Sequence, residues 1–159
     1  MIDTNDFLLN HYQSLALRTT SRDQRVYRVP ESVHDALRDY LGDGEGADQA
    51  ALEPVYAAFD QMTWSLGLTG EAGEFADMMK KHHGHNHDLD KEKAAKELGD
   101  VMWYVAVLAN SLGYKLSEIA DMNIQKLIKR YPNGFSVDES KNRKDLHGDF
   151  PGRGSGSKL

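Results

Sequence analysis

Apolar side chains recur at helical spacing along most of the chain. Amphipathic helices are predicted over residues 4–18, 33–41, 55–82, 91–112 and 118–131. Gly113 and the turn Pro132-Asn133-Gly134 are the clearest stop signals. We expect residues 43–53 to form a surface loop, residues 83–90 a polar connector, and order to fade beyond Phe135. Alternating runs typical of strands are missing, so the predicted fold class is all-α.

Two of the predicted helices have unusual composition. Gly67, Gly70 and Gly73 fall within seven residues of one helix, although glycine costs roughly 1 kcal/mol relative to alanine at such a position. We therefore expect a close helix contact there or a break near Gly67. The next helix is apolar nearly all round from residue 101 to 112 and is predicted to be the most buried one. Asp90 is placed to cap its N-terminus.

Length and charge exclude several classes of protein. With 159 residues and 40% hydrophobic content, we expect one domain over residues 1–143 and a flexible Gly/Ser-rich tail over 144–159. No apolar run is long enough to cross a membrane and the N-terminus does not resemble a signal peptide, so a cytoplasmic protein is predicted. The formal charge of −6 argues against a nucleic-acid surface. The lack of cysteine excludes disulfides and thiolate zinc sites.

Paired carboxylates are the strongest chemical signal. Glu71 and Glu74 on one predicted helix, and Glu97 and Asp100 on the next, are each spaced i, i+3 and so share a helix face. Solvated helix faces also produce such pairs, but these two adjoin the most apolar segments, where an uncompensated carboxylate is costly. If the helices pack antiparallel, the four carboxylates face one another. Oxygen ligands of this kind suit Mg²⁺ or Mn²⁺.

Other metal sites have weaker support. A di-iron site in a helical bundle needs a Glu-x-x-His motif on each of two helices, and the chain offers only Glu31-x-x-His34. Four histidines lie in or beside the polar connector, where a tetrahedral zinc site has no defined frame, so a surface loop is the preferred interpretation. They are His82, His83, His85 and His87.

Basic and aromatic residues are candidates for binding a nucleotide. Cationic and amide side chains that could contact its phosphates are Lys80, Lys81, Asn123, Lys126, Lys129 and Arg130. For the end of the last helix, the alternative is a solvated cationic terminus that complements the helix dipole. Trp64, Trp103 and Tyr104 are candidates for stacking on a base, although core packing is the commoner role of such residues. No P-loop, dinucleotide-binding motif or nucleophile elbow is present.

Three motifs, in this order, resemble the MazG-like members of the all-α nucleoside triphosphate pyrophosphohydrolases. The stretch 67–74 resembles the first acidic motif of that family, 96–104 the second, and 123–135 the basic third element. A shorter stretch from Tyr12 to Arg18 resembles the N-terminal part. The resemblance covers residues 8–19 and 55–143, leaving residues 20–54 as an unmatched insertion.

The resemblance implies a four- to five-helix bundle and a hydrolase. The implied reaction is Mg²⁺-dependent attack of water on the α-phosphorus, with Mn²⁺ as a substitute ion, giving a nucleoside monophosphate and pyrophosphate. We expect a deoxynucleoside triphosphate such as dGTP, or a non-canonical nucleotide, as substrate. Matching positions make metal ligands and catalytic residues of Glu71, Glu74, Glu97 and Asp100. They make phosphate contacts of Lys126, Lys129 and Arg130. A homodimer or homotetramer that completes the bundle is also implied.

One departure from the family pattern keeps alternatives open. Many relatives have a further glutamate where this chain has Gly70, so a metal ligand is either lost or replaced by Asp77 one turn away. A nucleotide-binding regulatory module without turnover is therefore the competing hypothesis, followed by a non-enzymatic helical scaffold. Within the enzyme class, phosphoribosyl-ATP pyrophosphohydrolase is the alternative activity.

Overall fold

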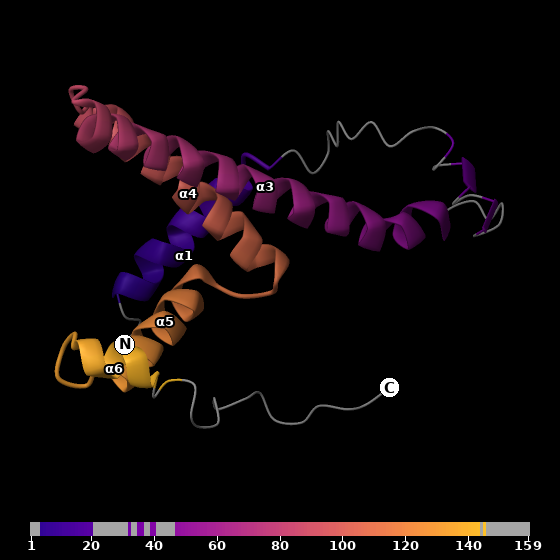
Figure 1. Cartoon of the computed structure of the whole chain (residues 1–159). Helices are drawn as coiled ribbons and strands as arrows, with labels where there is room; N and C mark the ends of the chain where they lie inside the picture. The colour runs from indigo at the N-terminus through magenta and orange to yellow at the C-terminus, as the bar shows by residue number, and fades with distance from the viewer. Residues whose placement is uncertain are drawn as a thin grey trace. The chain divides into compact units, whose positions relative to one another are not determined.

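The computed structural model describes residues 4–20, 32, 35, 36, 39, 40, 47–143 and 145. Their named helices are α1 (Thr4–Leu17), α3 (Ala47–His85), α4 (Lys91–Ser111), α5 (Leu116–Arg130) and α6 (Val137–Asn142) (Figure 1). The only β-type pairing in this part of the chain is an isolated bridge between Pro132 and Gly134, so the all-α prediction is confirmed. The predicted helix over 33–41 lies mostly outside the described residues, as does the tail except for Asp145. The chain forms two compact units, Met1–Leu116 and Ser117–Leu159.

Helix α3 is longer and more continuous than predicted. It begins at Ala47 and runs without a break past Gly67 to His85, so the predicted loop over 43–53 is wrong from residue 47 onward. Residues 47–53 are rich in alanine and other strong helix formers, which explains this early start. The continuity at Gly67 has a packing cause, because a Cβ at this glycine would lie 2.3–2.5 Å from atoms of the Tyr104 side chain. Gly67 thus meets the expectation of a close helix contact rather than that of a break.

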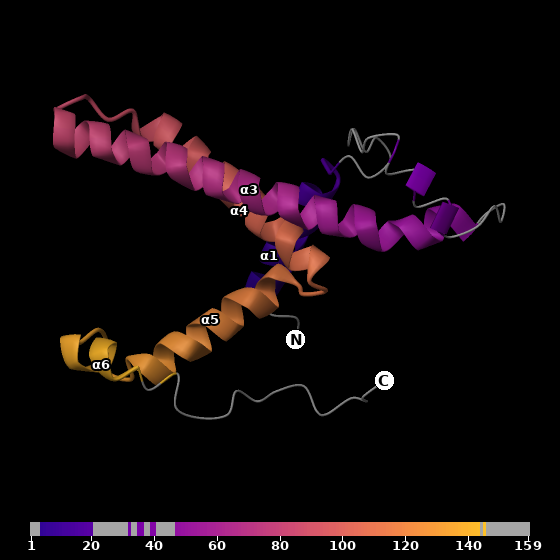
Figure 2. The same cartoon turned by 45° about the vertical axis from the view of Figure 1, so that its right-hand side comes forward.

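Helix α4 packs against both α3 and α1 and carries most of the described core. Five residues, 86–90, connect α3 to α4, and the two helices lie side by side in opposite directions (Figures 1 and 2). The Asp90 carboxylate accepts a hydrogen bond from the Lys93 backbone N–H at 2.9 Å, which confirms the predicted cap. Ala106 and Val107 are fully buried, as predicted for this segment, but Met102 is 48% exposed. One side of α4 is therefore open.

A buried glutamine joins α1 to the end of α4. The Gln13 side-chain amide donates to the backbone carbonyls of Ala106, at 3.3 Å, and Tyr114, at 3.0 Å. Its carbonyl oxygen accepts from the Leu116 N–H at 2.9 Å, which satisfies a donor at the first residue of α5. Gly113, with a φ of +77°, ends α4 as predicted. These bonds fix the turn that follows α4.

The second unit contains more order than predicted. The turn around Gly134, whose φ is +91°, follows α5 as expected. Beyond it, however, α6 begins at Val137, so the prediction that order fades after Phe135 is wrong. Ser136 caps α6 by accepting a hydrogen bond from the Glu139 N–H at 3.1 Å. A serine followed three residues later by glutamate is a capping box, a signal that the sequence contained.

The hydropathy of the helices tests whether any of them could cross a membrane. Among the residues that the structure describes, no helix combines the length and the apolar character needed to span a lipid bilayer.

Candidate active site

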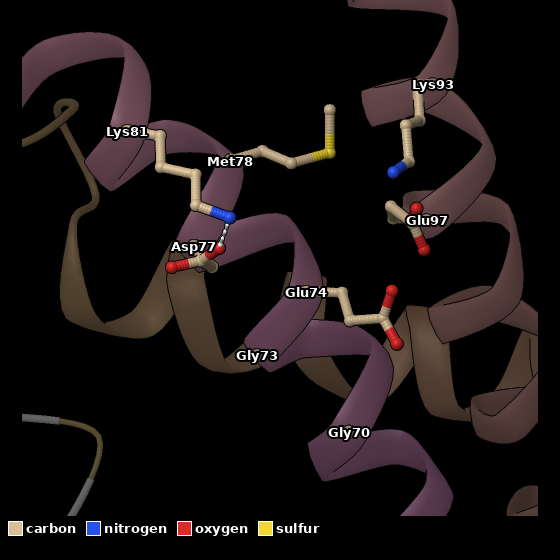
Figure 3. Close-up of a pocket in the computed structure, with 8 residues that line it drawn as sticks. All are labelled: Gly70, Gly73, Glu74, Asp77, Met78, Lys81, Lys93 and Glu97. Atoms are coloured by element: carbon tan, nitrogen blue, oxygen red, sulfur yellow. Dashed lines mark ion pairs between the residues drawn. The ribbon is translucent and has the colours of Figure 1, made fainter. Parts of the chain in front are cut away.

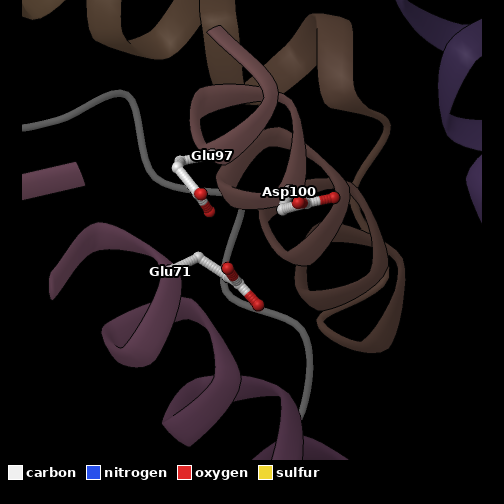
Figure 4. A group of neighbouring side chains, drawn as sticks. All are labelled: Glu71, Glu97 and Asp100. Atoms are coloured by element: carbon white, nitrogen blue, oxygen red, sulfur yellow. The ribbon is translucent and has the colours of Figure 1, made fainter. Parts of the chain in front are cut away.

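Three of the four predicted carboxylates meet between α3 and α4. One oxygen from each of Glu71, Glu97 and Asp100 lies within 4.8 Å of the other two (Figure 4). Glu71 comes from α3 and points toward Glu97 of α4, which is only 8% exposed. Three carboxylates this close repel one another unless a proton or cation lies between them. We call these three residues the carboxylate group.

The electrostatics of Glu71 reflect this crowding. Partial burial is the largest cause that raises its pKa above the ordinary value, followed by the negative charges of Glu74, Asp100 and Glu97. A hydrogen bond between the Glu71 and Glu97 side chains raises this pKa further, because such a bond requires a shared proton. Hard oxygen donors that bind a proton more tightly than usual suit a divalent cation such as Mg²⁺ or Mn²⁺. The donor set therefore fits the metal that the sequence predicts.

Glu74, the fourth predicted carboxylate, lies beside the group rather than within it. It lines an adjoining cavity of about 320 Å³. The cavity lies between α3 and α4 and is lined by Gly70, Gly73, Glu74, Asp77, Met78, Lys81, Lys93 and Glu97 (Figure 3). Glu97 belongs to both the cavity and the carboxylate group. The two features are thus parts of one site.

The predicted lysines of α3 are held by an aspartate. Asp77 forms ion pairs with Lys80, three residues on, and with Lys81, four residues on, the latter at 2.5 Å. Lys81 lines the cavity whereas Lys80 does not. Of the two lysines, the structure therefore brings only Lys81 to the described site.

Two of the three predicted aromatic residues, Trp103 and Tyr104, form contacts with other residues of the first unit. Tyr104 packs on Gly67 and meets Trp103 edge to face, with ring centroids 4.9 Å apart. The Trp103 indole N–H donates to the Thr19 hydroxyl at 2.7 Å. Trp64 is half-buried on α3, and neither it nor Tyr104 lines the cavity. The contacts of Tyr104 are those of a residue that packs between helices, which was the alternative to stacking on a base.

The remaining predicted phosphate contacts belong to the second unit. Asn123 and Lys129 are exposed on α5, and Lys126 is half-buried. Arg130 is engaged by Asp145, which accepts two hydrogen bonds from its guanidinium at 2.6 and 2.7 Å. These bonds lower the pKa of the Asp145 carboxyl and raise that of Arg130. In this structure Arg130 anchors the segment that follows α6.

Two residues near the carboxylates were missed from the sequence. Lys93 lines the cavity from α4, and its position four residues before Glu97 on the same helix face was the available signal. Tyr12 of α1 lies close enough to Asp100 for the negative charge to raise the pKa of its phenol, after the larger effect of burial. Tyr12 lies in the N-terminal stretch that resembles the family, but the sequence did not indicate a role for this residue.

The alternative metal ligands find no support in the described residues. Among these residues, the carboxylate group is the one place where three or more acidic or histidine side chains gather closely enough to hold an ion. His82 instead contacts the backbone carbonyl of His87 through its Nδ1 at 2.7 Å. Glu31 and His34 lie outside the described residues. His82, His83 and His85 belong to α3, so the predicted connector over 83–90 is shorter, 86–90.

Comparisons with known proteins agree with this geometry. Residues 59–135 match the family model of the MazG nucleotide pyrophosphohydrolase domain. The chain is also similar to the Gene 37 protein of Mycobacterium phage L5, with 41% identity over 83 residues, which cover 50% of this chain and 73% of the phage protein. No solved structure matches the chain. The matched region contains both the carboxylate group and the cavity.

Proposed function

Because the chain belongs to the MazG nucleotide pyrophosphohydrolase family, we propose that it is a metal-dependent nucleoside triphosphate pyrophosphohydrolase. It would hydrolyse the bond between the α-phosphorus and the oxygen that bridges to the β-phosphorus. Water adds to the α-phosphorus, and the products are a nucleoside monophosphate and pyrophosphate. A deoxynucleoside triphosphate such as dGTP, or a non-canonical nucleotide, is the proposed substrate, and the cytoplasm, where nucleotide pools are found, is the proposed compartment.

The convergence of Glu71, Glu97 and Asp100 carries this proposal. Their oxygens lie within 4.8 Å of one another and supply hard ligands for Mg²⁺, with Mn²⁺ as a substitute. When bound, the ion would neutralise phosphate charge and lower the pKa of a coordinated water. Glu74, at the edge of the same site, is the proposed fourth carboxylate.

Side chains in and around this group would accept the proton, stabilise the leaving group and contact the substrate. One carboxylate of the site would accept the proton of the attacking water. Lys81 and Lys93 line the adjoining cavity, where cationic side chains stabilise the negative charge that develops on the leaving pyrophosphate. Asn123, Lys126, Lys129 and Arg130 remain proposed phosphate contacts, and Trp64 and Tyr104 proposed contacts to the nucleoside. Lys80 is no longer proposed as a phosphate contact, because it does not line the cavity.

The first experiment is a substrate panel. Pyrophosphate release is measured from ribo- and deoxynucleoside triphosphates and from phosphoribosyl-ATP, with Mg²⁺, with Mn²⁺ and with a chelator, and the products are separated by chromatography. We expect metal-dependent formation of monophosphate and pyrophosphate. Metal-dependent nucleotide binding without release would indicate the regulatory module instead, and neither binding nor release would leave a helical scaffold.

Substitutions in the carboxylate group test the site itself. Glu97→Gln and Asp100→Asn each remove a ligand charge and should lower kcat by at least about 100-fold, since stabilisation by a correctly placed charge typically contributes this much. Glu92→Gln is the matched control, because Glu92 is an exposed α4 glutamate paired with Lys96 at 2.9 Å. Mg²⁺ should raise the melting temperature of the wild type and of the control. Full activity in both ligand variants would contradict the site assignment.

A further inference from the structure

Asp77 lines the cavity, as expected for a replacement ligand, but its carboxylate is already paired. It follows Glu74 by three residues on α3, so its spacing makes it the natural substitute for the ligand missing at Gly70. Its carboxylate, however, forms ion pairs with Lys80 and Lys81 at once. Hydrogen bonds from these two lysines lower the pKa of Asp77 to about 2. A carboxylate already neutralised by two ammonium groups is a poor ligand for a divalent cation.

The cavity is lined by side chains of both charge signs. Glu74 and Glu97 point into the space between α3 and α4 (Figure 3), and Glu97 also belongs to the carboxylate group. Lys93 of α4 and Lys81 of α3 supply the positive charges of the same cavity. Lys93 forms no ion pair with any residue that the structure describes. A ligand that carries both a cation and bare phosphates would match these charges of both signs.

We propose that Asp77 is a positioning residue, which holds the Lys81 ammonium at the cavity wall so that Lys81 contacts the terminal phosphates of a metal-chelated polyphosphate. The proposal rests on the proposed function for its choice of ligand. It differs from a metal-ligand role for Asp77, because Asp77 acts here through Lys81 and touches neither the ion nor the reacting phosphorus.

The direction in which Asp77→Asn changes pyrophosphate affinity distinguishes a positioning role from a purely electrostatic one. Asp77→Asn removes a negative charge from beside an anion site, so electrostatics alone would tighten the binding of pyrophosphate. A lysine side chain is half exposed here and flexible, and it loses much rotamer freedom when it binds an anion. If Asp77 restricts Lys81 beforehand, Asp77→Asn returns that freedom and weakens binding. The two explanations therefore predict changes in opposite directions.

Lys80 provides a matched control. It lies on α3 next to Lys81 and pairs with the same carboxylate, but it does not line the cavity. Lys80→Met and Lys81→Met change the net charge equally and keep a long side chain of high helix propensity. Any difference between them reports on the cavity rather than on overall charge.

The experiment measures binding to the full chain by calorimetry, with Mn²⁺ alone and with pyrophosphate in excess Mg²⁺ as probes. We expect Lys81→Met to weaken pyrophosphate binding about 10-fold and Asp77→Asn about 3- to 5-fold, with Lys80→Met within 2-fold of wild type. The Asp77→Asn/Lys81→Met double variant should bind no more weakly than Lys81→Met. Mn²⁺ affinity should stay within 2-fold in every variant, and melting temperatures establish that each one is folded.

Four results would overturn the proposal. These are weaker Mn²⁺ binding in Asp77→Asn, unchanged or tighter pyrophosphate binding in that variant, equal losses in the two lysine variants, and no pyrophosphate binding by the wild type. Turnover is scored separately with the substrate panel. A wild type that binds pyrophosphate but hydrolyses no nucleotide would refute the proposed function while leaving the role of Asp77 measurable.

Discussion

At the scale of single residues, Glu71 shows how crowded carboxylates change the pH dependence of stability. Its partial burial and the nearby Glu74, Asp100 and Glu97 raise its pKa. A carboxyl group with a higher pKa in the folded than in the unfolded chain binds its proton more tightly when folded. The metal-free protein therefore gains stability from Glu71 as the pH falls through this pKa, and loses it as the pH rises. The pKa of Asp77 is lowered to about 2, so this carboxylate has the opposite effect: its contribution to the stability of the folded chain is lost as the pH falls below about 4.

This argument predicts a stabilising substitution in a site residue. In EDTA at pH 7, Glu71→Gln should melt a few degrees above wild type, because it removes one of the crowded charges. The difference should shrink as the pH falls toward the raised pKa of Glu71. With Mg²⁺ the order should reverse, since the variant lacks a ligand for the ion. Thermal melts at several pH values, with and without Mg²⁺, measure both effects.

A control and a contrary result complete the Glu71 test. Glu92→Gln should show neither effect, because Glu92 is exposed and paired with Lys96. A lower melting temperature for Glu71→Gln in EDTA at pH 7 would mean that the carboxylates are not in conflict in the metal-free protein.

The site residues differ in how far the sequence could predict them. Regular i, i+3 spacing beside apolar segments, together with the resemblance to two acidic motifs, selected Glu71, Glu97 and Asp100, because helical geometry fixes which side chains share a face. Spacing does not reveal ion pairs, so the difference between Lys80, which stays outside the cavity, and Lys81, which lines it, required coordinates. Asp145 lies far along the chain from Arg130, and no local pattern predicts that pair.

At the scale of helices, the contact between α3 and α4 depends on one missing side chain. Tyr104 of α4 occupies the space where a Cβ at Gly67 would lie, 2.3–2.4 Å from two of its ring atoms and 2.5 Å from its hydroxyl oxygen. Gly70, one turn further along α3, has nothing within 4 Å of the corresponding position. Two glycines of the same motif therefore have different structural roles. The first permits close packing, whereas the second leaves space beside the cavity.

Alanine substitutions at these glycines should have opposite effects. Gly67→Ala forces Tyr104 to move and should destabilise the protein by about 1–3 kcal/mol, the usual cost of overpacking. Gly70→Ala meets no neighbour and should stabilise it by up to about 1 kcal/mol through helix propensity. Urea unfolding followed by circular dichroism measures both changes. Similar changes in the two variants would refute the assigned contact.

The same contact explains why the helix boundaries were harder to predict than the helices. Three glycines in seven residues suggest a break when α3 is considered alone, yet packing of Tyr104 on Gly67 stabilises a continuous helix. Tertiary contacts commonly override such weak local preferences. By contrast, Asp90 and Gly113 act through local backbone geometry, and both ends of α4 were predicted within one residue. The Ser136 capping box was equally local and was simply overlooked.

At the scale of the whole molecule, the first unit exposes two apolar stripes. Met62 and Leu66, one turn apart on α3, are 52% and 68% exposed. Leu98 and Met102, one turn apart on α4, are 46% and 48% exposed. Isolated exposed apolar residues are normal on a protein surface, but pairs aligned along a helix are typical of a face that packs against another helix. We propose that these stripes are covered in a homo-oligomer, as the resemblance to the family implies.

Charge substitutions in the stripes test this proposal. Wild type should elute as a dimer or tetramer in size-exclusion chromatography with light scattering, and Leu66→Glu or Leu98→Glu should shift it toward monomer by placing a charge in a buried apolar contact. Leu112→Glu is the control, since Leu112 is 62% exposed at the end of α4 and belongs to neither stripe. A monomeric wild type at micromolar concentration would refute the oligomer. Assembly that survives both stripe variants would instead place the contact elsewhere on the chain.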